Sequence, residues 1–571
     1  MKTSREKGSQ PIFGVKIEKD VYIEMRDGTR LAASIYRPDA VGRFPALLSM
    51  SPYDKDKQNI PLEPKNIIEA QNLEPASIME LASIEAGVSE YFVSRGYAHI
   101  IANVRGTFKS EGEYYGVFSP QEQEDGYDLV EWIAQQPWCN GKVGMVGVSY
   151  FAVIQYLLAS MKNPPPHLKA IFPLDGFTDL YRGLAYHGGI CTTGFPLFWY
   201  LPLRENSKTI PESPKLLGKN LEKTVHEALN NDAIKNRPEL IQILKNPELN
   251  PVVFDLLLNP TDGPMYWERS PHKQLGKIKI PTYTGSDWLK VPIHLRGAFT
   301  AFESIKAYKK LLIGPPEMVR PFSQYHDVIV RWYDFWLKGI NNKIMQEPLV
   351  KIFVMGINQW REENEWPLAR TKWTKYYLHN KGVLDTNPPG DDEKPDSYIY
   401  EPLNKRKKRK TRYYVRYETP SLAEDTEVTG PIALYLYALS TDSDPDWIVR
   451  IKDISPDGTK TVLTRGWLKA SHRDLDKGKS KPWQPYHPHR KIKPVKPDKV
   501  YEYAIEILPT SNVFKSGHKI GLEISSDDGE PTRPPDLIFS HLLSGRKMTN
   551  TIFHNPEYPS YLILPIIPPS S

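Results

Sequence analysis

The stretch GMVGVSYFAVIQ, residues 144–155, decides the fold of this chain. It begins with an apolar run up to Val148, which is typical of a strand buried on both faces of a parallel sheet. Gly147 lies two residues before Ser149, and the segment 150–160 continues with apolar residues at helical spacing. Strand, tight turn and helix in this order predict a β-turn-α unit that carries a serine at its turn.

Strand and helix signals alternate on both sides of this unit. Acidic residues in the first turns, apolar positions at helical spacing and a terminating proline predict a helix over 122–137, and a second helix over 327–338 ends at Gly339. Short apolar or alternating runs predict strands at 21–25, 31–36, 46–50, 98–104, 142–146, 170–174 and 280–284. This alternation predicts a right-handed, doubly wound α/β sheet.

The pattern changes twice along the chain. Helical segments broken by Pro and Asn, without a clear strand, predict an all-helical cap inserted at 176–271, and such insertions commonly cover a pocket. Further on the pattern is all-β, which predicts a C-terminal jelly-roll sandwich. We therefore expect a core in two parts, 1–175 and 272–346, separated by the cap and followed by the β domain at 347–571.

Composition argues against several classes of protein. The 571 residues carry 74 basic and 68 acidic side chains, and the net charge of +6 gives no reason to expect a nucleic-acid partner. No apolar run approaches the ~18 residues of a membrane span, and no apolar signal-peptide core opens the chain, so we expect a cytoplasmic enzyme without a membrane partner. Cys139 and Cys191 are too few for a disulfide framework or a cysteine-based metal site. The sequence contains no phosphate loop or calcium loop, and we expect no cofactor.

A serine at such a turn is suited to attack a carbonyl. A strained strand-to-helix turn raises the hydroxyl above the carboxyl edge of the sheet, where the next amide and the helix N-terminus face a developing oxyanion. The usual glycine two residues after the serine is absent, because Phe151 stands there and the small residue Ala152 comes one later. A plain buried strand-helix turn is the alternative, but the flanking strand and helix favour a nucleophile at Ser149.

The chain resembles a known family of α/β-hydrolases, the CocE/NonD and X-Pro dipeptidyl-peptidase (peptidase S15-like) group. The turn of that family has the form G-x-S-Y-x-G or G-x-S-Y-x-A, which residues 147–152 match. Further similar stretches are MRDGTRLAASIYRP (25–38), SPYDK (51–55), NVRGTFKSEGEY (103–114), QPWCNGKVGMVGVSY (136–150) and PDGTKTVLTRGWLKASHR (456–473). In the third of these, Asn103 replaces an aspartate of the family.

The resemblance has implications for both fold and chemistry. It implies an α/β-hydrolase core, a helical cap and a C-terminal jelly roll, and it implies hydrolysis of an ester or amide substrate through a Ser-His-Asp triad. It also implies that Ser149 is the nucleophile and that the Tyr53 hydroxyl and the Tyr150 amide form the oxyanion hole.

At the positions that the family gives to the other two triad members, this chain has different residues. The segment 280–299 matches the family's pattern without a gap, and the position of the catalytic aspartate falls on Lys290. Asp287 precedes it by three residues. The family's histidine is the last residue of a G-P-W-x-H element. This chain has GPPEM at the same place, so Met318 stands at the position of the histidine.

Three accounts of this departure stay open. In the first, the triad keeps shifted members, Asp287 with His294 or His326, although each histidine also fits an ordinary structural role. In the second, Lys290 under the cap is the base of a Ser-Lys arrangement. In the third, hydrolysis is lost, and the same groups promote a cyclisation or condensation of a carbonyl substrate in a biosynthetic, secondary-metabolic reaction.

A substrate pocket is expected near the serine. Asp175 follows a predicted strand and therefore lies at the carboxyl edge of the sheet, with a helix cap as its other interpretation. The other residues expected there are His187, Phe195, Trp199, Trp288 and Met318. The aromatic members are equally suited to a plain core cluster.

A carbohydrate-binding role of the β domain has only fold analogy behind it. The basic run at 404–412 fits a solvated loop, and assembly into a homo-oligomer stays open.

Overall fold

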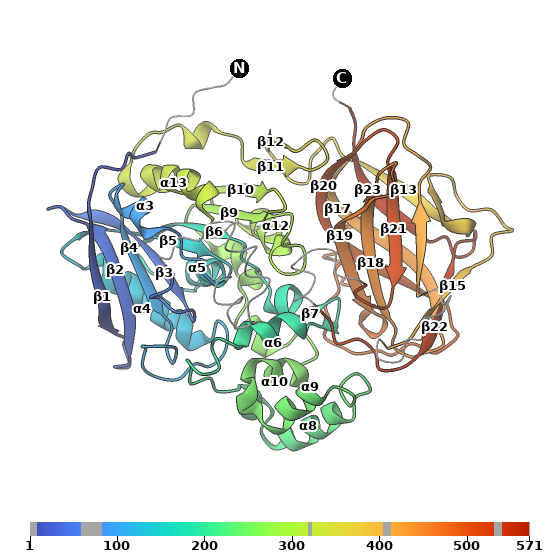
Figure 1. The fold of residues 1–571 in the computed structure, drawn as a ribbon, viewed down its shortest axis with the longest axis horizontal. Coiled ribbons are helices and arrows are strands. Elements are labelled where there is room, and N and C mark those ends of the chain that lie inside the picture. Colours follow the sequence, from blue (N-terminus) through green and yellow to red (C-terminus); the bar gives the residue numbers. More distant parts are fainter. Residues whose placement is uncertain (1–7, 59–82, 318–321, 403–412, 530–539, 570–571) are drawn as a thin grey trace.

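The computed structural model describes residues 8–58, 83–317, 322–402, 413–529 and 540–569. Within these residues the chain forms an N-terminal α/β part, a C-terminal β part and a group of inserted helices (Figure 1). In Figure 1 the α/β part lies on the left, the β part on the right, and the inserted helices lie below and between them.

The first sheet contains ten strands in the described part of the chain. In spatial order they are β1 (Val15–Glu24), β2 (Arg30–Pro38), β4 (Ala98–Asn103), β3 (Phe44–Ser51), β5 (Cys139–Val148), β6 (Leu168–Leu174), β9 (Thr282–Asp287), β10 (Lys309–Gly314), β11 (Val350–Val354) and β12 (Gln359–Glu363). Neighbours from β4 to β11 are parallel, whereas β1, β2 and β12 pair antiparallel. The predicted doubly wound sheet is confirmed.

Helices cover both faces of this sheet. The helices are α3 (Ser89–Val93), α4 (Pro120–Ala134), α5 (Tyr150–Ser160), α12 (Leu295–Ser304) and α13 (His326–Lys338). Successive residues of β5 point to opposite faces, because Met145 joins the apolar cluster under α4 and α5, while Val146 joins the cluster under α13. A central strand covered on both sides is therefore apolar throughout, which is why the stretch 143–148 has no polar residue.

The insertion between β6 and β9 is mainly helical. Its elements are a π-helical turn (Tyr181–Ala185), β7 (Tyr186–His187), β8 (Ile190–Cys191), α6 (Gly194–Tyr200), α7 (Ser213–Leu217), α8 (Leu221–Leu229), α9 (Pro238–Lys245), α10 (Pro251–Leu258) and α11 (Pro264–Trp267). The β7–β8 hairpin corrects the expectation of an all-helical cap. Gly188 and Gly189, both with positive φ, make its turn, and the amide of Lys469 donates to the Gly188 carbonyl, so the C-terminal part holds the hairpin in place.

The second sheet contains eleven strands among the described residues. In spatial order they are β15 (Asp396–Tyr400), β22 (Met548–Phe553), β17 (Thr426–Ser440), β20 (Tyr501–Phe514), β19 (Lys460–Lys469), β18 (Asp446–Ile454), β21 (Lys519–Ser525), β16 (Tyr414–Glu418), β14 (Val383–Asp385), β13 (Lys372–His379) and β23 (Tyr561–Ile567). Because β23 also pairs with β17, the sheet closes on itself and protects its edges. The predicted all-β C-terminal part is confirmed.

The first strand after residue 347 belongs to the first sheet, contrary to the expectation that it opens the sandwich. β11 pairs in parallel with β10, and β12 pairs with β11. If β10 were an edge strand, it would leave a row of backbone N–H and C=O groups unpaired. Pairing with β11 satisfies these groups. Its alternate residues Val350 and Ile352 are buried in the same apolar cluster as the C-terminal strands. The change from the α/β sheet to the β sheet therefore comes after β12.

Candidate active site

Ser149 occupies the turn between β5 and α5, as the sequence predicts. Its backbone, with φ 59° and ψ −114°, is in a region that a non-glycine residue adopts only at a cost. The amide of Ser149 donates to the carbonyl of Leu174, 3.0 Å away, at the end of β6. The Ser149 carbonyl accepts the amides of Ala152 and Val153 and so begins α5. The turn thus holds the serine at the carboxyl edge of the sheet, with 9 % of the residue exposed.

Gly147 and Phe151 explain the unusual form of this turn. Gly147 has φ 131°, and a Cβ placed on it would lie 2.4 Å from the Cβ of Phe151. Glycine is therefore required two residues before the serine. Phe151 needs no special backbone conformation, since it lies inside α5, and its ring packs edge-on against Tyr53 with centroids 6.0 Å apart. A phenylalanine after the serine is compatible with the turn.

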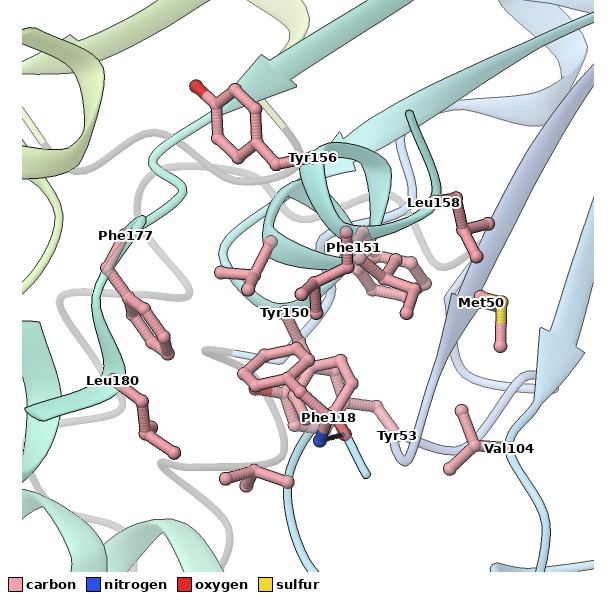
Figure 2. Close-up of a cluster of buried hydrophobic side chains, with 14 of the residues drawn as sticks. Met50, Tyr53, Val104, Phe118, Tyr150, Phe151, Tyr156, Leu158, Phe177 and Leu180 are labelled. Atoms are coloured by element: carbon pink, nitrogen blue, oxygen red, sulfur yellow. Dashed lines mark hydrogen bonds between the residues drawn. The ribbon is translucent and has the colours of Figure 1, made fainter. Parts of the chain in front are cut away.

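Tyr53 and Tyr150, the two residues expected to form the oxyanion hole, pack against each other at the start of α5, directly after Ser149. Tyr53 is 6 % exposed, and its ring packs edge-on against that of Tyr150 at a centroid distance of 6.0 Å (Figure 2). The indole of Trp199 donates to the Tyr53 hydroxyl oxygen at 2.8 Å and so fixes the position of the phenol. Tyr150 is the first residue of α5, where an amide has no acceptor within the helix.

Asn103 and Trp199 fix Tyr53 from two sides. The Asn103 side-chain amide donates to the Tyr53 carbonyl oxygen at 2.6 Å. This contact requires a donor, which an ionised aspartate at the same position lacks. Trp199 was expected to line the pocket as an apolar ring, and the structure adds a polar role through its indole N–H.

Two carboxylates lie at the carboxyl ends of strands β6 and β9, at the same edge of the sheet as Ser149. Asp175 directly follows β6, has φ 52°, and its Oδ1 accepts a hydrogen bond from the Ser286 hydroxyl at 2.9 Å. Asp287 ends β9, and its Oδ1 accepts the amide of Leu289 at 2.8 Å. Both residues are at least nine-tenths buried. The parallel arrangement of β5, β6 and β9 places the serine and both carboxylates at the same edge of the sheet.

Tyr325 is a residue of this edge that the sequence analysis missed. A Cβ on Gly314, the last residue of β10, would lie 1.9 Å from the Tyr325 hydroxyl and 3.7 Å from the Cβ of Asp287. Burial raises the pKa of the Tyr325 phenol, and the charges of Asp287 and Asp175 raise it further. The only sequence signal is the glycine that ends the strand, which leaves room for the phenol.

Lys290 lies in the turn that follows β9. Its amide donates to the Asp287 carbonyl, and its own carbonyl accepts the amides of Ile293, His294 and Leu295. The residue is 7 % exposed, and no described residue makes a hydrogen bond or ion pair with its side-chain amine.

The two substitute histidines have surroundings typical of structural residues. His326 begins α13, and its ring contacts those of Tyr91, Phe92 and Phe322 at centroid distances of 5.0 to 5.2 Å. Burial lowers the pKa of His326 to about 3, so its imidazole is neutral. His294 precedes α12 and stacks on Phe177, with ring centroids 6.1 Å apart.

His187 takes part in a different network. Its Nδ1 lies 2.9 Å from Nε2 of His541, whose Nδ1 lies 2.6 Å from a carboxylate oxygen of Asp528. His187 also lines a hollow where the cap, the core and the β part meet, and Ser149 is not among the residues lining that hollow. The structure therefore connects His187 with the C-terminal part.

The remaining expected pocket residues have different places. Trp288 is 1 % exposed, and its indole donates to the Phe353 carbonyl at 2.7 Å, which makes it a core residue. Phe195 is half-buried in α6, one turn before Trp199. Met318 lies outside the described residues.

The described ranges contain neither a candidate metal site nor a candidate membrane span. No group of three or more His, Cys, Asp or Glu side chains there is arranged to hold a metal ion. Both cysteines are buried and unbridged. No helix in the described ranges is both long and apolar enough to cross a bilayer.

A serine on a strained strand-to-helix turn, at the carboxyl edge of a doubly wound sheet and beside a buried phenol, defines an α/β-hydrolase of the serine type. The model of the X-Pro dipeptidyl-peptidase (S15) family matches residues 27–317, and that of the X-Pro dipeptidyl-peptidase C-terminal non-catalytic domain matches residues 342–563. The chain belongs to this family of serine hydrolases.

Individual relatives agree with this assignment. The chain is 27% identical to the cocaine esterase of Rhodococcus sp. (strain MB1 Bresler), over 96% of this chain and 98% of that protein. It is 22% identical to the Xaa-Pro dipeptidyl-peptidase of Lactobacillus helveticus, over 68% of this chain and 54% of that enzyme. A crystal structure of a CocE/NonD family hydrolase from Staphylococcus aureus superposes with a TM-score of 0.76 at 25% identity, covering 97% of this chain and 93% of that one.

Proposed function

We propose that the chain hydrolyses small carboxylic esters through Ser149. The observation that carries the proposal is the strained Ser149 turn next to the Tyr53 phenol, whose oxygen is held by the Trp199 indole. In this geometry the serine hydroxyl attacks the ester carbon, and the phenol and the Tyr150 amide donate to the oxygen that becomes negative. An ester is preferred over an X-Pro amide because the chain is 27% identical to the cocaine esterase and 22% identical to the Lactobacillus peptidase.

The test is labelling with a fluorophosphonate, followed by mapping of the modified peptide. We expect a single adduct on Ser149, none in Ser149→Ala, and turnover of p-nitrophenyl butyrate that is lost in the same variant. Ser160→Ala is the matched control, since Ser160 lies at the other end of α5 and its hydroxyl donates to the Leu157 carbonyl. Glycyl-prolyl-p-nitroanilide provides the amide comparison. An unlabelled Ser149, or full ester turnover by Ser149→Ala, contradicts the proposal.

The proton relay that we propose differs from Ser-His-Asp. Both substitute imidazoles pack against aromatic rings. Besides the Tyr325 phenol, the described residues then provide Lys290, Asp175 and Asp287 as ionisable side chains at the carboxyl edge. We assign Lys290 as the proton acceptor in a Ser-Lys arrangement, with the carboxylate of Asp175 at the adjacent strand end. The support is the place of Lys290 just after β9, and a side-chain amine for which the described residues provide no partner.

A non-hydrolytic reaction is the second candidate, and the same residue favours it. Lys290 stands where the family has its catalytic aspartate, and an oxyanion hole without a competent relay can still polarise a carbonyl. In that case Ser149 resists the fluorophosphonate and ester turnover stays at the level of Ser149→Ala. The labelling experiment therefore separates cyclisation or condensation of a carbonyl substrate from hydrolysis.

A further inference from the structure

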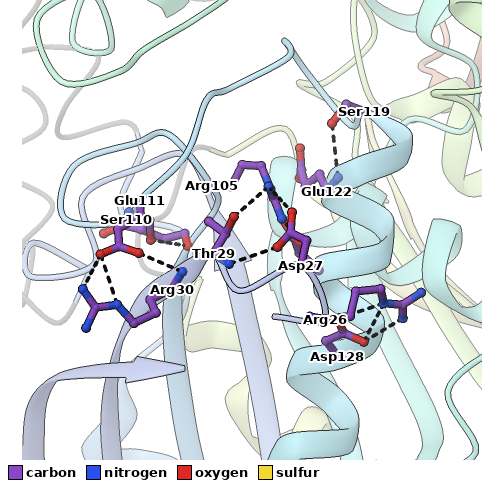
Figure 3. Close-up of polar contacts among 12 residues, drawn as sticks. Arg26, Asp27, Thr29, Arg30, Arg105, Ser110, Glu111, Ser119, Glu122 and Asp128 are labelled. Atoms are coloured by element: carbon purple, nitrogen blue, oxygen red, sulfur yellow. Dashed lines mark hydrogen bonds and ion pairs between the residues drawn. The ribbon is translucent and has the colours of Figure 1, made fainter. Parts of the chain in front are cut away.

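Glu122 lies directly beneath the nucleophile turn and has no role in the chemistry described above. It belongs to the first turn of α4, where the Ser119 hydroxyl caps the helix by accepting the Glu122 amide at 3.2 Å (Figure 3). In such a cap the glutamate carboxyl usually turns back to the amide of the capping residue itself. Here one carboxyl oxygen, Oε2, accepts the amide of Phe118 at 3.1 Å and the hydroxyl of Tyr150 at 2.7 Å. The carboxyl therefore links the start of α4 to the start of α5.

The Tyr150 side chain is held from several directions. Its hydroxyl donates to Glu122, accepts the Phe118 amide at 3.1 Å, and lies 3.1 Å from the Tyr114 hydroxyl. Its ring stacks on that of Phe118 with centroids 4.0 Å apart, as Figure 2 shows. The backbone amide of Tyr150 is the first amide of α5. A side chain held by this many contacts fixes the position of the Tyr150 Cα and so restrains the amide bonded to it.

Glu122 meets this site in its uncharged form. It is 2 % exposed, and its other oxygen, Oε1, is buried without a hydrogen-bond partner among the described residues. Burial raises the pKa of Glu122 to about 8, since a charge is poorly solvated there. The ionisable groups around it are Tyr150 on α5, Tyr114, Arg269 and Asp125 on α4 itself. Asp125 raises this pKa further, whereas Tyr150 and Arg269 lower it.

We propose that Glu122 is a positioning residue of the oxyanion hole, whose carboxyl anchors the Tyr150 phenol and so directs the Tyr150 amide. The inference rests on the proposed function, because it assigns that amide to the oxyanion. Without the hydrogen bond from Tyr150 to Glu122, the Tyr150 amide is still present but is held less firmly. The transition state is then less stabilised, because the oxyanion forms there. Ionisation of Glu122 places a second negative charge near the oxyanion and acts in the same direction.

The test compares steady-state kinetics of the full chain on p-nitrophenyl butyrate. Glu122→Ala is expected to lower kcat by about tenfold with KM nearly unchanged. Tyr150→Phe removes the other half of the contact and keeps the stacked ring, so a similar loss is expected. The double variant should be no worse than either single one, because both remove one shared contact.

The pH profile provides a readout that a purely structural role does not move. Wild-type kcat is expected to fall as the pH rises through about 8, where Glu122 ionises. Glu122→Gln cannot ionise and keeps an acceptor oxygen, so it should recover most of the activity lost in Glu122→Ala and lack this alkaline decline.

Glu131→Ala is the matched control, because Glu131 lies on the same helix and its carboxyl binds His167. Each variant is compared at equal folded fraction, measured by thermal unfolding. A kcat of Glu122→Ala equal to that of Glu131→Ala, an effect on KM alone, or an alkaline decline that persists in Glu122→Gln overturns the inference. Absence of wild-type turnover and of Ser149 labelling would instead overturn the proposed function.

Discussion

Two residues at the carboxyl edge of the first sheet hold a strained backbone. Ser149 and Asp175 both have positive φ at the ends of adjacent strands, and each such non-glycine residue costs about 1 to 3 kcal/mol. The hydrogen bonds of their backbones hold them there: the Ser149 amide binds Leu174, and the Asp175 amide binds Gly285. Strain held by the sheet at two neighbouring residues is typical of a functional site.

Lys290→Met tests the proposed Ser-Lys relay, because it keeps the length of the side chain and removes its amine. We expect kcat/KM for p-nitrophenyl butyrate to fall by at least about a hundredfold over the whole pH range, because the serine loses its proton acceptor. Lys279→Met, an exposed lysine just before β9, should retain wild-type kinetics. Retention of most of the activity by Lys290→Met would exclude the Ser-Lys relay.

The turn between β5 and α5 depends on Gly147, the next-to-last residue of β5. Gly147 has positive φ and no room for a Cβ, whereas Gly116 has φ 72° with no atom within 4 Å of the place where a Cβ would lie. The two glycines therefore separate the cost of the backbone conformation from the cost of the clash.

We expect Gly116→Ala to lower the free energy of unfolding by about 1 kcal/mol, the cost of a left-handed backbone. Gly147→Ala adds a clash with Phe151 and should cost about 2 kcal/mol more, together with reduced labelling of Ser149. Urea unfolding of both variants measures the difference. Equal costs would mean that the turn relaxes around the added methyl group.

Most of these elements could be predicted from the sequence alone. The helix expected at 150–160 coincides with α5, and the helix expected at 327–338 matches α13 within one residue. Their apolar periodicity and end signals are local, so no tertiary contact is needed to find them. β7 and β8 could not be found in this way, because two-residue strands have no period and form only where the C-terminal part binds their turn.

For the whole molecule, buried neutral histidines make stability depend on pH. Burial lowers the pKa of His99 and His326 to about 3 and that of His472 to about 4. Between these values and the ordinary value near 6.5, the unfolded chain binds more protons than the folded one, so stability is lost as the pH falls. Glu122 acts oppositely, because its raised pKa costs stability as the pH rises from about 4.5 to about 8.

His326→Phe tests the acid side of this balance. His326 lies among three aromatic rings, and a phenylalanine fits there without a titrating group. Between pH 6.5 and pH 5 each such histidine costs about 2 kcal/mol of unfolding free energy, and the variant should lose about that much less over this interval. His226→Phe, at an exposed site on α8, should keep the wild-type loss. An identical pH dependence of wild type and His326→Phe would contradict this account.

The sequence by itself determined the alternation of strands and helices in the core, the serine turn and the presence of an α/β and a β part, because these depend on residue periodicity and on glycines that a turn requires. Only the tertiary structure decided which side chains meet. Tyr325 reaches Gly314 and Asp287, Glu122 reaches Tyr150, and His326 enters an aromatic cluster. These contacts join residues that are far apart in the chain or lie on different elements, and no local pattern encodes the packing that brings them together.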